Sequence, residues 1–147
     1  MVRPAYETDA DVANEAAVIG RLRAACGFKA AKLPRWYEVD YAACRGEDIC
    51  GWLEVKVRGK SYSTYRVSLK KWRAGLNLSA TTRLPFLLVV CWPERGESVI
   101  RYVAATRTTP FRVVFAGRWD RGGAQDMGPM AEIDMAHFKL LQEGSRA

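Results

Sequence analysis

One stretch decides the fold: residues 39–57, which read VDYAACRGEDICGWLEVKV. Apolar and polar side chains alternate from Arg35 to Ala43 and again from Ile49 to Arg58, and this period of two predicts two β-strands. Residues 45–48 read RGED, a turn that contains glycine, so we expect the strands to form an antiparallel hairpin. Each strand then has one apolar face and one face that carries charged groups.

Charged side chains on the polar faces of this hairpin can converge on one point. Asp40 lies on the first strand, and Glu54 and Lys56 lie two positions apart on the second. Side chains so spaced on a strand are about 6.6 Å apart, so both can reach toward a shared ligand. Mg²⁺ takes oxygen ligands and is usually held by one or two carboxylates, with water and phosphate completing its shell. The pattern therefore predicts a Mg²⁺ site at Asp40 and Glu54, with the Val55 carbonyl as a further ligand. Mn²⁺ is expected to substitute.

The charge balance changes directly after this hairpin. Residues 56–93 contain eight basic residues and no acidic residue, and the whole chain has a formal net charge of +7. Such a block favours an acidic partner, and in nucleic acids cations position the phosphates while rings such as Tyr62 and Tyr65 can stack on exposed bases. A solvated surface that keeps the chain soluble is the alternative. The candidate nucleic-acid-binding residues are Arg58, Lys60, Arg66, Ser68, Lys70, Lys71 and Arg73.

A helix is predicted over residues 9–26, because Thr8 or Asp9 can cap its start and Gly27 follows its end. Glu15 lies beside the apolar stripe of this helix, so its carboxylate either marks a boundary position or points into a site. The stripe consists of Val12, Ala16 and Ile19.

Ser68 is the predicted N-cap of a second helix, in which Leu69, Trp72 and Leu76 form the buried stripe. Residues 86–92 predict a buried strand, and residues 99–104 and 111–119 predict two more. Loops are expected over residues 59–65 and 120–129.

These residues together resemble the PD-(D/E)XK nuclease superfamily over about residues 8–104. The resemblance is carried by Asp40, a 13-residue gap, Glu54-Val55-Lys56, a preceding helix with Glu15 and a following basic helix. It implies that Asp40 and Glu54 hold the metal, that Lys56 assists catalysis and that Glu15 completes the site; Glu7 and Glu38 are substitutes for Glu15. It also implies that Ser68, Lys70 or Lys71 can enter the site. The chain departs from the written motif because Val39 stands where the proline would be.

The expected architecture is a single α/β domain over residues 1–147. Its central mixed β-sheet is flanked by helices, and the resemblance implies a restriction-endonuclease-like core (αβββαβ), with residues 105–147 as a C-terminal extension. The four cysteines form no CxxC pair and there is one histidine, so a structural zinc site is not expected. No apolar run is long enough to span a bilayer, and we expect no membrane partner and a reduced, cytoplasmic setting.

The predicted function is that of a metal-dependent DNA endonuclease that hydrolyses phosphodiester bonds through the D…ExK site. The resemblance implies an enzyme of the Holliday-junction-resolvase type or of the phage type, and a symmetric cut would require a homodimer. RNA is a second possible substrate. A catalytically inactive nucleic-acid-binding module with a nuclease-like fold is the first alternative, and a protein that binds an acidic partner is another. For Asp40 and Glu54, the alternative is an exposed hairpin face with a salt bridge to Lys56.

Overall fold

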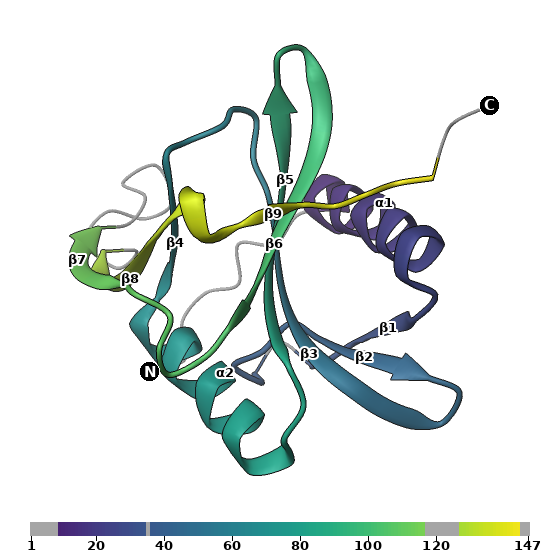
Figure 1. The fold of residues 1–147 in the computed structure, drawn as a ribbon, viewed down its shortest axis with the longest axis horizontal. Helices are drawn as coiled ribbons and strands as arrows, with labels where there is room; N and C mark the ends of the chain where they lie inside the picture. The colour runs from purple at the N-terminus through teal and green to yellow at the C-terminus, as the bar shows by residue number, and fades with distance from the viewer. Residues whose placement is uncertain (1–8, 35, 117–126, 145–147) are drawn as a thin grey trace.

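The computed structural model describes residues 9–34, 36–116 and 127–144, and the side chains from residue 13 onward. Its centre is a six-stranded sheet with the order β1-β2-β3-β5-β6-β9 (Figure 1). β3 and β5 pair in parallel and the other neighbours pair antiparallel, so the sheet is mixed. The strands are β1 Lys29–Lys32, β2 Tyr41–Arg45, β3 Asp48–Val57, β5 Phe86–Glu94, β6 Glu97–Ala105 and β9 Lys139–Leu140.

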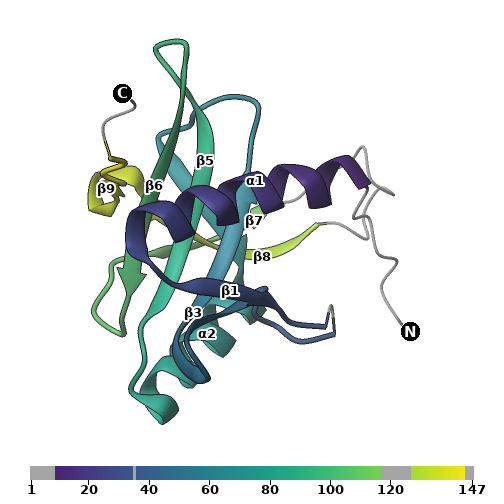
Figure 2. The same ribbon diagram turned by 90° about the vertical axis from the view of Figure 1, so that its right-hand side faces the viewer.

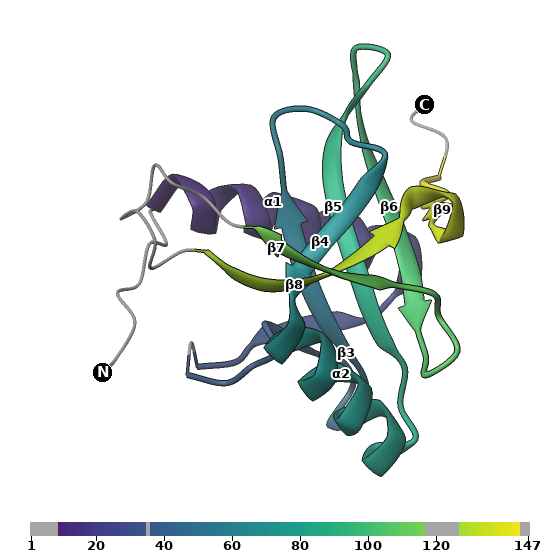
Figure 3. The ribbon, with the colours of Figure 1, turned by 90° about the vertical axis from the view of Figure 1, so that its left-hand side faces the viewer.

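Helices lie on both faces of this sheet, as the sequence predicts. α1 (Asp9–Cys26) crosses one face, as Figure 2 shows, and α2 (Leu69–Thr82) lies on the other. The second face is also covered by a three-stranded antiparallel sheet with the order β4-β8-β7, seen in front in Figure 3. Its strands are β4 Thr64–Ser68, β7 Arg112–Ala116 and β8 Gly128–Asp134, and the 3-10 turn η3 (Met135–His137) leads on to β9.

Alternation along the strands divides the core into two layers. Leu53 and Val55 of β3 pack with Val18 and Leu22 of α1 on one side of the sheet. Residues at even positions of β5 pack on the other side with Trp72 of α2 and with the three-stranded sheet. Consequently the face of β3 that carries Glu54 looks toward α2 and β4.

Two local features fix α2 on this face. Ser68 caps its start, since the backbone N–H of Lys71 donates to the Ser68 hydroxyl at 3.2 Å. One turn after Lys71, Gly75 lies directly on the buried ring of Phe86, and a Cβ at that position would be 2.1 Å from Phe86 Cε2. The helix therefore approaches the sheet more closely than any larger residue would allow.

The structure corrects several predicted elements. Trp36 to Asp40 form a turn and bends, so the strand expected from Arg35 begins only at Tyr41. Within the loop expected over 59–65, β4 already begins at Thr64. The strand expected over 111–119 is observed as Arg112–Ala116, and residues 117–119 lie outside the described residues. The end of the loop expected over 120–129 belongs to β8, which begins at Gly128. In α1 the buried residues are Val18 and Leu22, whereas Ala16 of the predicted stripe is exposed. No helix in the described part of the chain is long and apolar enough to cross a membrane.

Candidate nuclease site

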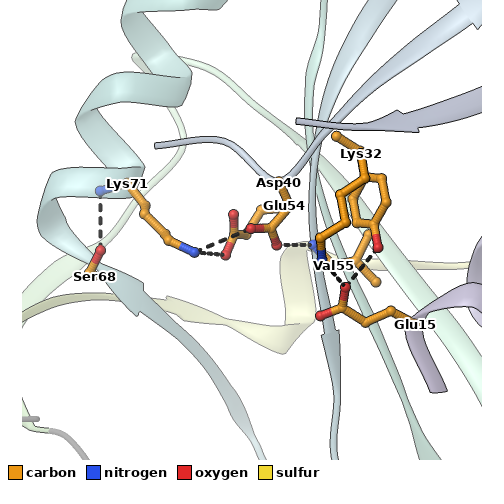
Figure 4. Close-up of polar contacts among 8 residues, drawn as sticks. Glu15, Lys32, Asp40, Glu54, Val55, Ser68 and Lys71 are labelled. Atoms are coloured by element: carbon orange, nitrogen blue, oxygen red, sulfur yellow. Dashed lines mark hydrogen bonds and ion pairs between the residues drawn. The ribbon is translucent and has the colours of Figure 1, made fainter. Parts of the chain in front are cut away.

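An ammonium group joins two carboxylates between β3 and α2. Lys71 Nζ lies 3.0 Å from Glu54 Oε1 and 3.3 Å from Asp40 Oδ1 (Figure 4). Glu54 is buried, with 3% of its surface exposed, whereas Asp40 is half-buried. The local sequence does not predict this difference between the two carboxylates. The alternative of an exposed hairpin face is therefore wrong for Glu54, and its ion pair is with Lys71.

Asp40 is oriented by the neighbouring strand. It precedes β2, and its Oδ2 accepts a hydrogen bond of 3.3 Å from the Val55 backbone N–H. The chain turns sharply just before this point, since the Tyr37 N–H donates to the Pro34 carbonyl. Asp40 is thus held by a backbone group of β3 and brought beside Glu54, which is the convergence that the hairpin predicts.

Burial and charge shift the pKa of the groups in this cluster. Burial, followed by repulsion from Asp40, raises the pKa of Glu54 to about 7, and the ammonium groups of Lys71 and Lys56 oppose this change. Burial lowers the pKa of Lys71, but attraction to Glu54 and Asp40 outweighs it, so the net shift is upward. Lys71 therefore stays charged while Glu54 can gain or lose a proton near neutral pH.

Lys56 lies on the same side of β3 as Glu54. Burial, followed by repulsion from Arg58, lowers its pKa to about 8. Its Nζ is 5.3 Å from the centre of the Tyr65 ring, on β4. Lys56 is thus placed close to the carboxylates without being their ion-pair partner, and an aromatic ring supports its ammonium group.

Glu15 is placed elsewhere. Its Oε2 accepts a hydrogen bond of 2.7 Å from the Tyr41 hydroxyl and lies 3.3 Å from Lys32 Nζ. In Figure 4 it is on the other side of β3 from Glu54 and Lys71. The structure therefore does not bring Glu15 to the carboxylate pair; of its two substitutes, Glu38 pairs with Lys70 at 3.3 Å and Glu7 lies outside the described residues.

The basic residues predicted to contact nucleic acid fall into separate places. Lys71 is part of the carboxylate cluster and Ser68 caps its helix, while Lys70 and Arg73 are exposed on α2. Arg66 pairs with the buried Glu132 on the outer face of the three-stranded sheet, at 2.6 Å. Arg58 and Lys60 follow the end of β3, where Lys60 Nζ lies 5.2 Å from the Tyr62 ring centre.

Tyr65 was missed as a member of the site. The sequence suggested a ring that stacks on bases, but Tyr65 is 2% exposed and cannot do so. The sequence predicts a loop over residues 59–65, because β4 is short and its pairing partner, β8, lies far along the chain. The alternation of polar Thr64 and Arg66 with apolar Tyr65 and Val67 is the sequence signal that indicates this strand.

The residues present fit a hard divalent cation. Glu54 Oε2 is buried and has no hydrogen-bond partner among the described residues, so one carboxylate oxygen is left to bind a ligand. Asp40 supplies a second carboxylate beside it, and Mg²⁺ needs no more than one or two. Within the described ranges no group of three or more His, Cys, Asp or Glu residues could hold a metal ion, so water and phosphate would complete its shell.

A family model described as "Phage putative PDDEXK endonuclease" matches residues 1–141. The chain belongs to this family. The PD-(D/E)XK resemblance is therefore confirmed.

One solved structure similar to the PDDEXK chain is Hjc of Archaeoglobus fulgidus, a Holliday junction resolvase from an archaeal hyperthermophile. The sequence identity is 13% and the TM-score is 0.49, and the match covers 84% of this chain and 81% of that one. No curated protein sequence matches the PDDEXK chain.

Proposed function

We propose that the protein is a metal-dependent DNA endonuclease that hydrolyses phosphodiester bonds at Asp40, Glu54 and Lys56. The observation that carries this proposal is the buried Glu54 carboxylate, which lies beside Asp40 and keeps Oε2 without a partner in the described structure. Burying a carboxylate in this way costs folding free energy, and carboxylates with a strongly raised pKa are concentrated at functional sites. Membership of the PDDEXK family supports the same reading.

The carboxylates and the two lysines of the site would have different roles in hydrolysis. Asp40 and Glu54 would hold Mg²⁺ or Mn²⁺, with the Val55 carbonyl as a further ligand, and the bound cation would supply an activated water and neutralise charge on the phosphoryl oxygens. Lys56, whose pKa is lowered to about 8, can hold or release a proton near neutral pH. Lys71 remains an ammonium group and can stabilise the negative charge that develops on the phosphate.

The charge distribution supports DNA as the substrate. The formal net charge of +7 comes mainly from residues 56–93, which also carry Lys56 and Lys71 of the site. Arg58, Lys60 and Arg73 are exposed and can contact phosphates, which position a strand without reading its sequence. We therefore expect cleavage with little sequence preference.

Plasmid cleavage tests the proposal. Supercoiled DNA is incubated with Mg²⁺, Mn²⁺ or EDTA, using the wild type, Glu54→Gln and Lys56→Met. Glu94→Gln is the matched control, because Glu94 is a half-buried, hydrogen-bonded carboxylate on β5 outside the site. We expect cleavage with either metal, none in EDTA, and loss in both site variants but not in the control. Cleavage that survives both site substitutions would reject the assignment.

A nucleic-acid-binding module without activity is the second candidate, and one observation favours it. Lys71 Nζ already lies between both carboxylates and places a positive charge where a metal ion would bind. Such a module would bind DNA in EDTA with strong dependence on salt but leave every substrate intact. The assay panel therefore includes linear, nicked, flapped and four-way DNA and RNA. Sedimentation shows whether the protein is a homodimer, which symmetric cleavage of a junction would require.

A further inference from the structure

The most exposed large apolar side chain of the described structure lies on the loop that leads to Asp40. Trp36 is 80% exposed, and its neighbour Tyr37 is 56% exposed. The other tryptophans among the described residues pack in or against the core, and neither Trp36 nor Tyr37 stacks on another ring of the described chain. Two adjacent rings thus leave apolar surface in water, which makes them candidates for contact with a partner.

The loop that joins β1 to β2 is anchored, so this exposure is not that of a loose segment. The Leu33 N–H donates to the Asp40 carbonyl at 2.9 Å, and the Tyr37 N–H donates to the Pro34 carbonyl at 2.8 Å. Val39 is 2% exposed and packs in the core. The loop projects past the ends of β1 and β2 (Figure 2), and its two aromatic rings are held at the surface by a backbone of defined shape.

Ion pairs place this loop along the first turn of α2, beside the carboxylates. Glu38 Oε1 lies 3.3 Å from Lys70 Nζ. Two residues further on, Asp40 Oδ1 lies 3.3 Å from Lys71 Nζ. Trp36 precedes Asp40 by four residues, and a chain of that length spans at most about 14 Å. Neighbouring bases of a stacked strand are about 3.4 Å apart, so the rings lie within a few nucleotides of a phosphate bound at the site.

The charge around the two rings suits a nucleic-acid strand. Lys70 and Arg73 are exposed on α2, within residues 56–93, the block that has eight basic residues and no acidic residue. Basic groups hold phosphates while exposed rings stack on bases, and stacking tolerates any sequence because every base has an aromatic face. In a uniform duplex the faces of the bases are covered by their neighbours, so the rings can stack where bases are unpaired.

We propose that Trp36 and Tyr37 stack on unpaired bases of the DNA strand that the site cuts, so that DNA with unpaired bases beside the cut is bound and cleaved in preference to uniform duplex. This inference deepens the proposed function and rests on it, because the strand is the one that reaches Asp40 and Glu54. Tyr65, a ring that the sequence suggests for stacking, is buried, whereas these two rings are open to solvent.

Binding without turnover tests the stacking. A labelled oligothymidylate and a blunt duplex are titrated in EDTA with the wild type, Trp36→Ala, Tyr37→Ala and Trp36→Phe. We expect each alanine variant to bind the single strand about fivefold to a hundredfold more weakly, with little change for the duplex and none in Tm. Trp36→Phe keeps a ring and should recover most of the affinity. Leu140→Ala is the matched control and should bind as the wild type does, because Leu140 is an exposed apolar residue on β9, at the opposite edge of the sheet from β1.

Cleavage in Mg²⁺ tests the substrate class. We expect flapped or single-stranded DNA to be cut with a higher kcat/KM than linear duplex, and Trp36→Ala to remove most of this preference through KM.

The outcomes separate this inference from the proposed function. The stacking is overturned if the alanine variants bind the single strand as tightly as the wild type, or lose affinity for single strand and duplex alike. It is also overturned if lost binding comes with a lower Tm and Trp36→Phe does not recover it, since the role is then structural. An active wild type that cuts uniform duplex equally well overturns the substrate class. A wild type that shows the ring-dependent binding but cleaves no substrate overturns the proposed function and leaves the stacking surface standing.

Discussion

Replacing Lys71 with methionine tests how the carboxylate pair is held together. Methionine keeps most of the aliphatic side chain but removes the ammonium group that lies 3.0 Å from Glu54 and 3.3 Å from Asp40. The side chain of Glu54 is 4% exposed and that of Lys71 is 38% exposed, so the pair is neither fully buried nor fully solvated. Exposed ion pairs contribute up to about 1 kcal/mol and breaking a buried pair costs about 3–5 kcal/mol. We expect a loss near 2 kcal/mol at pH 8, which corresponds to a Tm lower by roughly 4–8 °C.

The loss should depend on pH with a defined sign. Burial and Asp40 raise the pKa of Glu54 to about 7, and Lys71 is one of the groups that keep it from rising further. At pH 8 the variant must either bury an unpaired carboxylate or protonate it. At pH 5 Glu54 is already largely protonated in both proteins, so the ion pair contributes less and the difference in unfolding free energy should shrink.

Thermal unfolding in EDTA at pH 8 and pH 5 measures this difference. Lys70→Met is the control, because Lys70 is the exposed neighbour on α2 and should change stability by no more than about 0.5 kcal/mol. Added Mg²⁺ or Mn²⁺ should stabilise Lys71→Met more than the wild type, since an ammonium no longer competes for the carboxylates. A variant that is as stable as the wild type at pH 8, or destabilised equally at both pH values, would refute this account of the cluster.

Two further predictions concern stability outside the carboxylates. Gly75→Ala should destabilise the protein by about 2 kcal/mol in urea unfolding, because the added Cβ would meet the buried ring of Phe86 at 2.1 Å and overpacking outweighs the gain in helix propensity. Asn77→Ala, exposed on the same helix, should be neutral or stabilising, and a neutral Gly75→Ala would show that α2 can shift away. Glu94→Gln should cost about 1 kcal/mol at pH 7. Hydrogen bonds from Arg101 lower the pKa of Glu94, so its contribution is present above the ordinary carboxyl pKa and is lost as the pH falls through the lowered pKa. The cost should therefore fade in acid, and a pH-independent cost would contradict this explanation.

Local patterns in the sequence predicted the two faces of β3 and the start of α2 correctly. The alternation along β3 placed Leu53 and Val55 on one face and Glu54 and Lys56 on the other, and Ser68 was identified as the cap of α2. These features depend on neighbours within a few residues, and the glycine-containing turn fixes how the hairpin closes. Membership of the PDDEXK family followed from the same residues.

Features that depend on distant parts of the chain were not predictable in this way. The partner of β4 is β8, whose first residue is Gly128, so a short alternation around Tyr65 is the one local indication of this strand. The contact between Lys71 and the carboxylates depends on how closely α2 approaches the sheet, and Gly75 leaves room for this close approach to Phe86. Glu15 lies beside the predicted stripe of Val12, Ala16 and Ile19, whereas the helix turns Val18 and Leu22, with the half-buried Ile19, toward the sheet.

The pairing of β4 with β8 has a consequence for the order of assembly. Every side chain of the carboxylate cluster belongs to a residue before position 72, and so does Tyr65 on β4. The strand that pairs with β4 is β8, which ends only at Asp134. Closing such a long loop is slow compared with forming the hairpin of β2 and β3. On a ribosome, the β3 side of the candidate site would form early and the β4 side late, so we infer that a nascent chain completes this site only after β8 has been synthesised.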